Sequence, residues 1–199
     1  MTDEGLPTVT PPFEGAAGET DAPSPAPRVA GVLLAAGTSS RFGDANKLLA
    51  TVDGEPVVRR AARTLTEAGL DPVVVVVGHE AERVRTAVED LPAETVDNDA
   101  YAAGQSTSVR TGIDTVRGED PRARGDAPVD AAVVALGDMP FVDPGTVEAL
   151  VAAYAAGAGD ALAAAHEGDR GNPVLFDRGF FDRLAAVDGD VGGPWEVVL

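Results

Sequence analysis

The chain of 199 residues contains no cysteine. A disulfide framework, a thiolate metal site and a thiol nucleophile are therefore all excluded. Long apolar runs are also missing, because runs such as Val73 to Val77 are far below the ~20 residues that span a bilayer. The first residues, MTDEGLPTV, lack the basic and apolar regions of a signal peptide. These absences predict a soluble, cytoplasmic protein.

Basic residues are scarce, and lysine almost absent. The fifteen basic residues comprise fourteen arginines and a single lysine, Lys47, against 33 acidic residues, which leaves a net charge of −18. This balance disfavours nucleic acids and anionic membranes as partners. It favours a halophilic protein, because in molar salt the Debye length falls to ~3 Å and a dense acidic surface no longer strongly repels itself. An acidic protein adapted to ordinary salt is the alternative.

Composition divides the chain into a leader and one domain. Residues 1–27 hold six prolines among Gly, Thr, Ala and acidic residues, with no helical or strand period. This texture predicts a disordered, acidic, Pro-rich leader. Residues 28–199 are enough for one well-packed domain and too few for two large ones.

Strand and helix patterns alternate along that domain. Apolar runs predict buried strands at 29–35, 72–78 and 130–137, and ALAAAH (161–166) and NPVLFD (172–177) predict two more around the turn EGDRG. Helical periods and caps predict helices at 56–69, 79–91, 106–118, 143–157 and 178–187. The fold class is therefore α/β, with a mostly parallel sheet covered on both faces.

The ends of three strands are informative, because α/β sheets bind ligands beyond the carboxyl ends of their strands. The first strand leads into TSSRFGDANK, whose glycines and small side chains let backbone N–H groups approach an anion. This is no Walker A loop, since Gly43 is followed by Asp44 rather than Lys-Ser/Thr, and it lacks the dinucleotide pattern G-x-G-x-x-G. The second strand ends at Gly78-His79 and the third at Gly137-Asp138.

The first and third strand ends carry the groups that phosphate chemistry needs. Arg41 can hold phosphate oxygens bidentately, and Lys47 is a compact charge suited to a moving phosphoryl group. A solvated turn lysine is the alternative, but elsewhere this chain uses arginine for that purpose. Asp138 can hold Mg²⁺, whereas the better helix cap is Asp143. Together these residues indicate metal-assisted nucleotidyl or phosphoryl transfer.

Two motifs resemble a known family. The pattern L-A-A-G-x-x-S-R-F-G-x-x-x-K-L-L, followed about ninety residues later by G-D-M-P-F, is similar to the MobA-like nucleotidyltransferases. That family has a glycosyltransferase-A-like, Rossmann-like fold of three α/β/α layers. The combination of NKLL, GDMPFV, GNPVLF and GDVGG is most similar to molybdenum cofactor cytidylyltransferases, and the resemblance extends from Val29 to about Gly193.

The resemblance implies a reaction. An enzyme of this kind transfers NMP from an NTP, here CTP, to a phosphorylated acceptor, here a molybdopterin-type cofactor, with Mg²⁺ and release of pyrophosphate. A molybdoenzyme or its chaperone is the implied protein partner. Use of GTP, a sugar-phosphate or other small-phosphate acceptor, and a degraded nucleotide-binding accessory protein remain open as alternatives.

The resemblance also implies residue roles. Arg41 and Lys47 match the cations that neutralise the triphosphate, Asp138 matches the aspartate that binds Mg²⁺ with the α-phosphate, and Asp190 matches a second metal ligand. Ser106 has a plainer alternative role as the cap of the following helix. The implied nucleotide-binding residues are Leu34, Ala35, Ala36, Gly37, Arg41, Lys47, Gly78, Asn98, Gly104, Gln105, Ser106, Ser108 and Asp138.

The C-terminus departs from the family pattern. After Asp190 the family continues into a basic residue and a closing element, whereas here Gly193-Pro194-Trp195 follows and the sequence stops at Leu199. A shortened ending, an edge completed by a partner and an altered reading frame are all compatible with this. The two histidines, His79 and His166, are predicted to be structural or peripheral, because the mechanism needs no imidazole.

Overall fold

The computed structural model describes residues 8–13, 26–38, 46–118 and 128–187. Two predicted site residues, Arg41 and Asp190, lie outside these ranges, as do Trp195 and most of the predicted leader. Within the described ranges, no helix is both long and apolar enough to cross a bilayer.

A central sheet organises the described part of the chain. Six strands lie in the order β5-β4-β1-β6-β8-β7, and β2 and β3 form a separate small ribbon. β5, β4, β1 and β6 are parallel, and β8 is antiparallel to both β6 and β7. The strands are β1 (Val29–Ala35), β2 (Thr51–Val52), β3 (Glu55–Pro56), β4 (Val73–Val77), β5 (Glu94–Asp97), β6 (Ala131–Leu136), β7 (Ala161–His166) and β8 (Asp169–Asp177).

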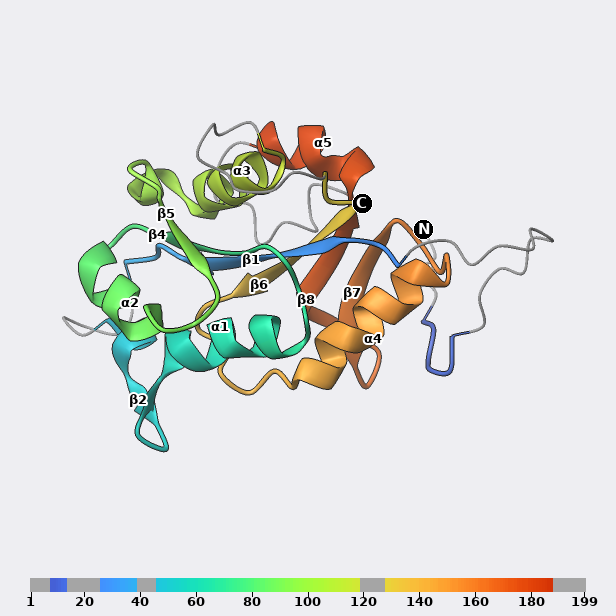
Figure 1. Ribbon diagram of the computed structural model, residues 1–199, viewed down its shortest axis with the longest axis horizontal. Helices are drawn as coiled ribbons and strands as arrows, with labels where there is room; N and C mark the ends of the chain where they lie inside the picture. The colour runs from blue at the N-terminus through green and yellow to red at the C-terminus, as the bar shows by residue number, and fades with distance from the viewer. Residues whose placement is uncertain (1–7, 14–25, 39–45, 119–127, 188–199) are drawn as a thin grey trace, which may run out of the picture.

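Helices cover both faces of this sheet. Figure 1 shows α3 and α5 on one side and α1, α2 and α4 on the other. The α-helices are α1 (Val57–Glu67), α2 (Ala81–Val88), α3 (Gln105–Val116), α4 (Pro144–Ala155) and α5 (Phe181–Ala185). Short 3₁₀ turns are η2 (Lys47–Leu49), η3 (Tyr101–Ala103) and η4 (Arg178–Phe180).

Two hydrophobic cores follow from the alternation of side chains along each strand. Leu33 and Val75 point into the core under α1, α2 and α4, and Val32 and Val74 point into the core under α3 and α5. α3 packs very close to the sheet, because a Cβ added at Gly112 would lie 2.3 Å from a methyl group of Val32. Strands buried on both faces read as continuous apolar runs, which explains why they were predictable.

The predicted fold class is confirmed, as are the predicted strands and helices apart from details at their ends. α2 starts two residues later than predicted, because Glu80 adopts a left-handed conformation with φ 53°. β8 begins at Asp169, so the predicted turn EGDRG is shorter than expected. The predicted helix at 178–187 is the turn η4 followed by α5. β5 was missed, because its sequence ETVD carries no apolar pattern.

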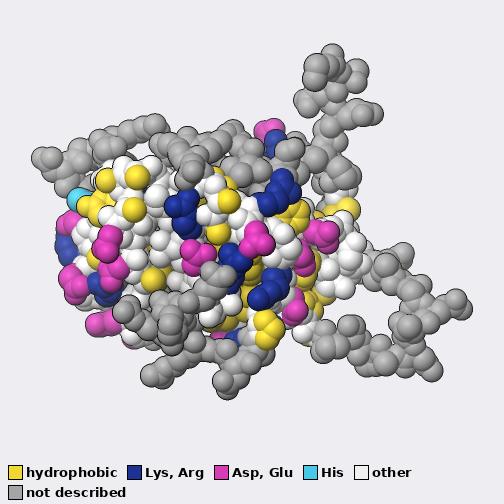
Figure 2. Space-filling view, turned by 90° about the horizontal axis from the view of Figure 1, so that it is seen from above, with side chains coloured by type: hydrophobic (Ala, Val, Ile, Leu, Met, Phe, Trp, Pro, Cys, Tyr) yellow, Lys and Arg dark blue, Asp and Glu magenta, His cyan; other side chains and the backbone are white. Residues whose placement is uncertain are grey.

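Charged side chains of both signs share the surface. Figure 2 shows acidic and basic side chains interleaved on the face above α3 and α5. Several arginines bind carboxylates of other segments, as in the pairs Arg28–Asp71, Arg85–Asp97 and Arg117–Asp182. Several arginines therefore connect segments within an acidic surface.

Candidate active site

The carboxyl ends of the four parallel strands meet at one edge of the sheet. Hydrogen bonds hold the residues beyond each strand in register: Gly137 N donates to Leu34 O (2.9 Å), His79 N to Ala36 O (3.1 Å) and Asn98 N to Val77 O (2.8 Å). This edge therefore brings together the segments in which the sequence placed its candidate residues.

Local structure turns Lys47 away from the core. Lys47 opens η2, and its two neighbours are buried. The Asn46 side chain accepts a hydrogen bond from Leu48 N (3.0 Å), and Leu48 is only 3% exposed in the core beside α1. With both neighbours anchored, the Lys47 side chain extends from the sheet edge and stays 39% exposed.

Asp138 comes to the same place from the far side of the chain. It lies in the turn directly after β6, in the segment 137–143 that leads into α4 and ends at Asp143, which caps that helix. Lys47 Nζ donates to Asp138 Oδ2 at 2.6 Å, across 91 residues of sequence. Both side chains remain about one-third exposed. Two of the three predicted catalytic residues are thus in direct contact.

A cleft of about 540 Å³ opens beside this ion pair. Lys47 and Asp138 are its charged lining residues. The other lining residues are mostly apolar and come from the end of η2, the start of α1 and the segment 137–143: Ala50, Val57, Met139, Pro140, Phe141 and Val142. The cleft is therefore suited to a ligand with one anionic and one apolar part.

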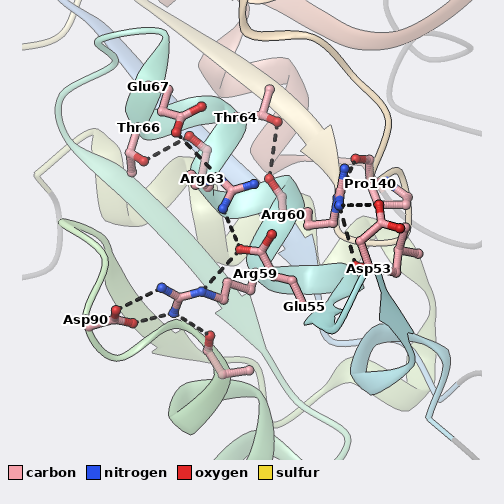
Figure 3. Close-up of polar contacts among 12 residues, drawn as sticks. Asp53, Glu55, Arg59, Arg60, Arg63, Thr64, Thr66, Glu67, Asp90 and Pro140 are labelled. Carbon is pink, nitrogen blue, oxygen red and sulfur yellow. Dashed lines mark hydrogen bonds and ion pairs between the residues drawn. The ribbon is translucent and has the colours of Figure 1, made fainter.

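α1 holds the segment 137–143 in place, as Figure 3 shows for Arg60 and Pro140. Arg60 Nε donates to the Pro140 carbonyl (3.4 Å), and Arg60 also binds Asp53 and the Val52 carbonyl. Thr64 Oγ1 donates to the Val142 carbonyl (3.0 Å). Sequence analysis missed these residues, because the arginines of α1 resemble an ordinary solvated helix face.

Asn98 stabilises the segment that follows β5. Its side chain is buried, and its Nδ2 donates to Thr107 Oγ1 (2.9 Å) and Ser108 Oγ (3.0 Å). Its Oδ1 accepts from Ala100 N (3.0 Å). Asn98 therefore ties the end of β5 to the first turn of α3, so its role in this structure is to shape the predicted nucleotide segment.

The start of α3 differs from the simple capped helix that the sequence suggested as an alternative. Gly104 occupies the cap position, with φ 120° and no side-chain hydrogen bond, so Ser106 is not the cap. Gln105 opens the helix, and Ser106 and Ser108 are buried. This segment and the strand ends at Gly78 and Gly37 remain the predicted nucleotide-binding surface.

Gly78 also has a packing reason to be glycine. A Cβ added there would lie 2.8 Å from the Tyr101 side chain and 2.9 Å from that of Ala36. Leu34, Ala35 and Ala36 are buried, whereas Gly37 is exposed and nothing lies near its missing Cβ. Only Gly37 of this group offers its backbone openly to a ligand.

The two histidines lie at this edge without forming a catalytic pair. The His79 ring sits 6.2 Å from that of Tyr101, and its Nε2 is 3.9 Å from Glu80 Oε2. A hydrogen bond from Arg83, opposed by some loss of solvation and aided by one from Asn46, holds the pKa of Glu80 below its ordinary value. His166 is exposed at the end of β7.

The residues present fit Mg²⁺ held jointly with a substrate. Asp138 offers carboxylate oxygen to the cleft, and oxygen is the ligand that Mg²⁺ prefers. Within the described ranges, no three Asp, Glu, His or Cys side chains cluster closely enough to form a metal cage. A metal ion here would take its remaining ligands from water and phosphate, as Mg²⁺ commonly does.

Comparison with known proteins identifies the family. A model of the MobA-like NTP transferase domain matches residues 31–198. The chain belongs to the MobA-like NTP transferases. Membership confirms the resemblance read from LAAGTSSRFGDANKLL and GDMPF, and it makes the protein an enzyme of the nucleotidyltransferase class.

The individual relatives carry different names. Nicotine blue oxidoreductase of Paenarthrobacter nicotinovorans is 31% identical over 195 residues, covering 92% of this chain and 89% of that protein. A probable molybdenum cofactor guanylyltransferase of Natronomonas pharaonis is 36% identical over 120 residues, covering 60% of this chain. The matched part spans only 54%, about half, of the length of that guanylyltransferase.

Solved structures support the fold and include a relative bound to a divalent metal. Rv0371c of Mycobacterium tuberculosis H37Rv superposes with a TM-score of 0.70 at 28% identity, over 87% of this chain and 82% of that one. The same protein is also known in complex with manganese. A relative with this fold thus binds a divalent metal.

Proposed function

We propose that this enzyme transfers a nucleotidyl group from CTP to a terminal phosphate on a molybdopterin-type acceptor and releases pyrophosphate, with Mg²⁺ as the metal. The single observation that carries the proposal is the contact between Lys47 and Asp138 at the carboxyl edge of the sheet. It joins a candidate phosphate-binding cation to a candidate metal ligand, in the lining of a cleft large enough for a substrate.

The reaction needs one bond made and one bond broken. An oxygen of the acceptor phosphate attacks the α-phosphorus of the NTP, and the bond from that phosphorus to the bridging oxygen breaks, so the electron pair leaves with pyrophosphate. Lys47 stabilises negative charge on the phosphates as it moves to the leaving group. Asp138 would hold the Mg²⁺, which supplies further charge neutralisation when bound. Arg41 and Asp190 are proposed to assist as a second cation and a second metal ligand.

Orientation supplies much of the expected rate enhancement. Arg60 and Thr64 hold the segment that bears Asp138, and the buried neighbours of Lys47 hold η2. Asn98 shapes the segment 98–108 that we propose contacts the nucleotide. Fixing both substrates against preformed groups lowers the entropic part of the barrier.

GTP is a second candidate for the nucleotide. The observation in its favour is the 36% identity with a protein named a probable molybdenum cofactor guanylyltransferase. Backbone groups such as those of Gly37 can read base edges, so the side chains here do not distinguish CTP from GTP.

The test is pyrophosphate release from each of the four NTPs, with and without molybdopterin, in buffers from dilute to molar KCl. Acceptor-dependent release with CTP supports the proposal, and release with GTP alone supports the second candidate. The Asp138→Ala variant is the control for contaminating activity. Absence of acceptor-dependent release from all four NTPs would overturn the proposed function.

The oxidoreductase relative defines a further control. That protein covers nearly all of this chain, so a redox activity must be assayed beside nucleotidyl transfer. We expect the Lys47–Asp138 pair to be required for pyrophosphate release. A redox turnover that survives Asp138→Ala, in a protein that releases no pyrophosphate, would assign this chain to the chemistry named for that relative.

A further inference from the structure

Phe141 breaks the usual pattern of aromatic residues. It is 76% exposed, whereas Phe176 and Phe181 are 1% and 2% exposed. Among the described residues, the large hydrophobic side chains that are exposed are Phe141 and Val9, and Val9 is less exposed, at 50%. Phe141 also differs from Val9 in its position, because it lines the cleft together with Lys47 and Asp138. The exposed Phe141 ring is therefore available to contact a ligand bound beside Lys47 and Asp138.

The ring is held in a defined place. The guanidinium carbon of Arg60 lies 5.8 Å from the centre of the Phe141 ring, within the range of a cation–π contact. Arg60 is itself fixed to the carbonyls of Pro140 and Val52 and to Asp53, as Figure 3 shows for Pro140 and Asp53. One side of the ring thus has a firm backing, and most of its surface remains open.

The lining of the cleft combines two chemistries. Lys47 and Asp138 suit a phosphate, while Phe141, Val57 and Met139 suit an apolar or planar group. A small phosphate or a sugar phosphate would leave the apolar side chains without a partner. A flat ring system attached to a phosphate would use both kinds of lining.

Position separates this ligand from the nucleotide. The cleft lies between the segment 137–143 and the start of α1, on the face of the sheet that carries α1 and α4. The predicted nucleotide surface lies beyond β1, β4 and β5 and at the start of α3, which covers the other face. The Lys47–Asp138 pair stands between the two, where a phosphate from each substrate could meet.

We infer that Phe141, backed by Arg60, is the stacking platform for the ring system of the proposed acceptor. The inference rests on the proposed function and adds to it a named specificity residue.

The first test is binding of flavin mononucleotide, a fluorescent planar ring system with one phosphate, to the full chain without NTP. We expect quenching of its fluorescence on binding, weakened about tenfold or more by Phe141→Ala and retained by Phe141→Trp. Phe180→Ala is the matched control, because Phe180 also has an arginine, Arg183, 5.3 Å from its ring centre, but packs beneath the other face of the sheet.

Two outcomes of this binding test would overturn the inference. One is equal affinity of wild type and Phe141→Ala, with both folded by thermal melting. The other is displacement of flavin mononucleotide by ribose 5-phosphate at similar concentration, which would mean that only the phosphate is bound.

The second test uses turnover. Phe141→Ala should raise the KM for the acceptor and leave the KM for the NTP unchanged, and Phe141→Trp should restore the acceptor KM. A raised KM for the NTP alone would assign the cleft to the nucleotide and overturn the inference. A wild-type protein without pyrophosphate release would refute the proposed function, while flavin mononucleotide binding would still decide the role of Phe141.

Discussion

Two of the ion pairs that join distant segments of this protein differ in chemistry. Lys47 and Asp138 meet in the lining of a cleft through a single compact ammonium group. Arg59 uses a planar fork: it binds both oxygens of Asp90, the Ala87 carbonyl and Glu55, and so ties α1 to the end of α2, as Figure 3 shows. The first pair opens onto a cleft that can admit a ligand, and the second connects helices outside it.

The comparison teaches what the single lysine means. Away from the cleft, the ion pairs that bridge segments of the described chain, as at Arg59 or Arg117, use arginine, whose several donors hold one geometry. Lysine occurs where a small, easily redirected charge faces a cleft. Lysine thus forms the contact that a substrate phosphate can replace, and arginine forms the contacts that stabilise the fold.

The largest expected effect is the loss of activity in Asp138→Ala. Removing this carboxylate should lower the rate of pyrophosphate release by more than about a hundredfold, because a group that stabilises charge in the transition state is lost. The fold should persist, since the side chain lies at the surface of a cleft. Asp90→Ala is the matched variant and should keep its turnover. Near-normal, Mg²⁺-dependent rates in Asp138→Ala would remove that residue from the site.

The next largest effect is expected when the basic residue of each ion pair, Lys47 or Arg59, is replaced by the other basic residue type. Lys47→Arg should reduce kcat on the order of a hundredfold, because a wider guanidinium misplaces the phosphates, with little change in KM. Lys47→Ala should be at least as slow. The reverse exchange, Arg59→Lys, should leave turnover intact and lower only the melting temperature. If Lys47→Arg has wild-type kinetics, Lys47 is an ordinary surface residue.

Salt should have two opposite effects on the stability of the fold. Screening weakens exposed ion pairs such as Arg59–Asp90, but it also relieves the self-repulsion of a chain with net charge −18. We expect repulsion to dominate, so the melting temperature should rise from dilute buffer to molar KCl. A flat or falling melting temperature over that range would contradict the halophilic interpretation.

The smallest expected effect is a change in acid sensitivity. The hydrogen bond from Arg59, only partly offset by loss of solvation, lowers the pKa of Asp90 from 3.8 to about 2. Its contribution to stability is therefore full above the unfolded pKa near 4 and is lost as the pH falls through about 2. Asp90→Asn should melt slightly below wild type at pH 7, and the difference should vanish near pH 2. A difference that stays constant with pH would show that the charge of Asp90 does not stabilise the fold.

Much of the fold could be read from local patterns. The runs at β1, β4 and β6 are apolar because parallel central strands are buried on both faces, and that burial leaves a direct mark on the sequence. Asp143 before Pro144 predicted the start of α4, which the structure confirms. The edge strand β5 left no such mark, because its residues are partly exposed and need no apolar pattern.

The candidate site divides in the same way. The sequence by itself determined which residue types were available: a single lysine in a Gly/Ser-rich turn and an aspartate after a buried strand, with the family motifs around them. Only the tertiary structure decided that Lys47 and Asp138, 91 residues apart in sequence, touch, because their contact depends on β1 and β6 lying side by side. The same holds for Arg60 behind Phe141 and for the cleft, since local sequence patterns do not specify contacts between distant segments.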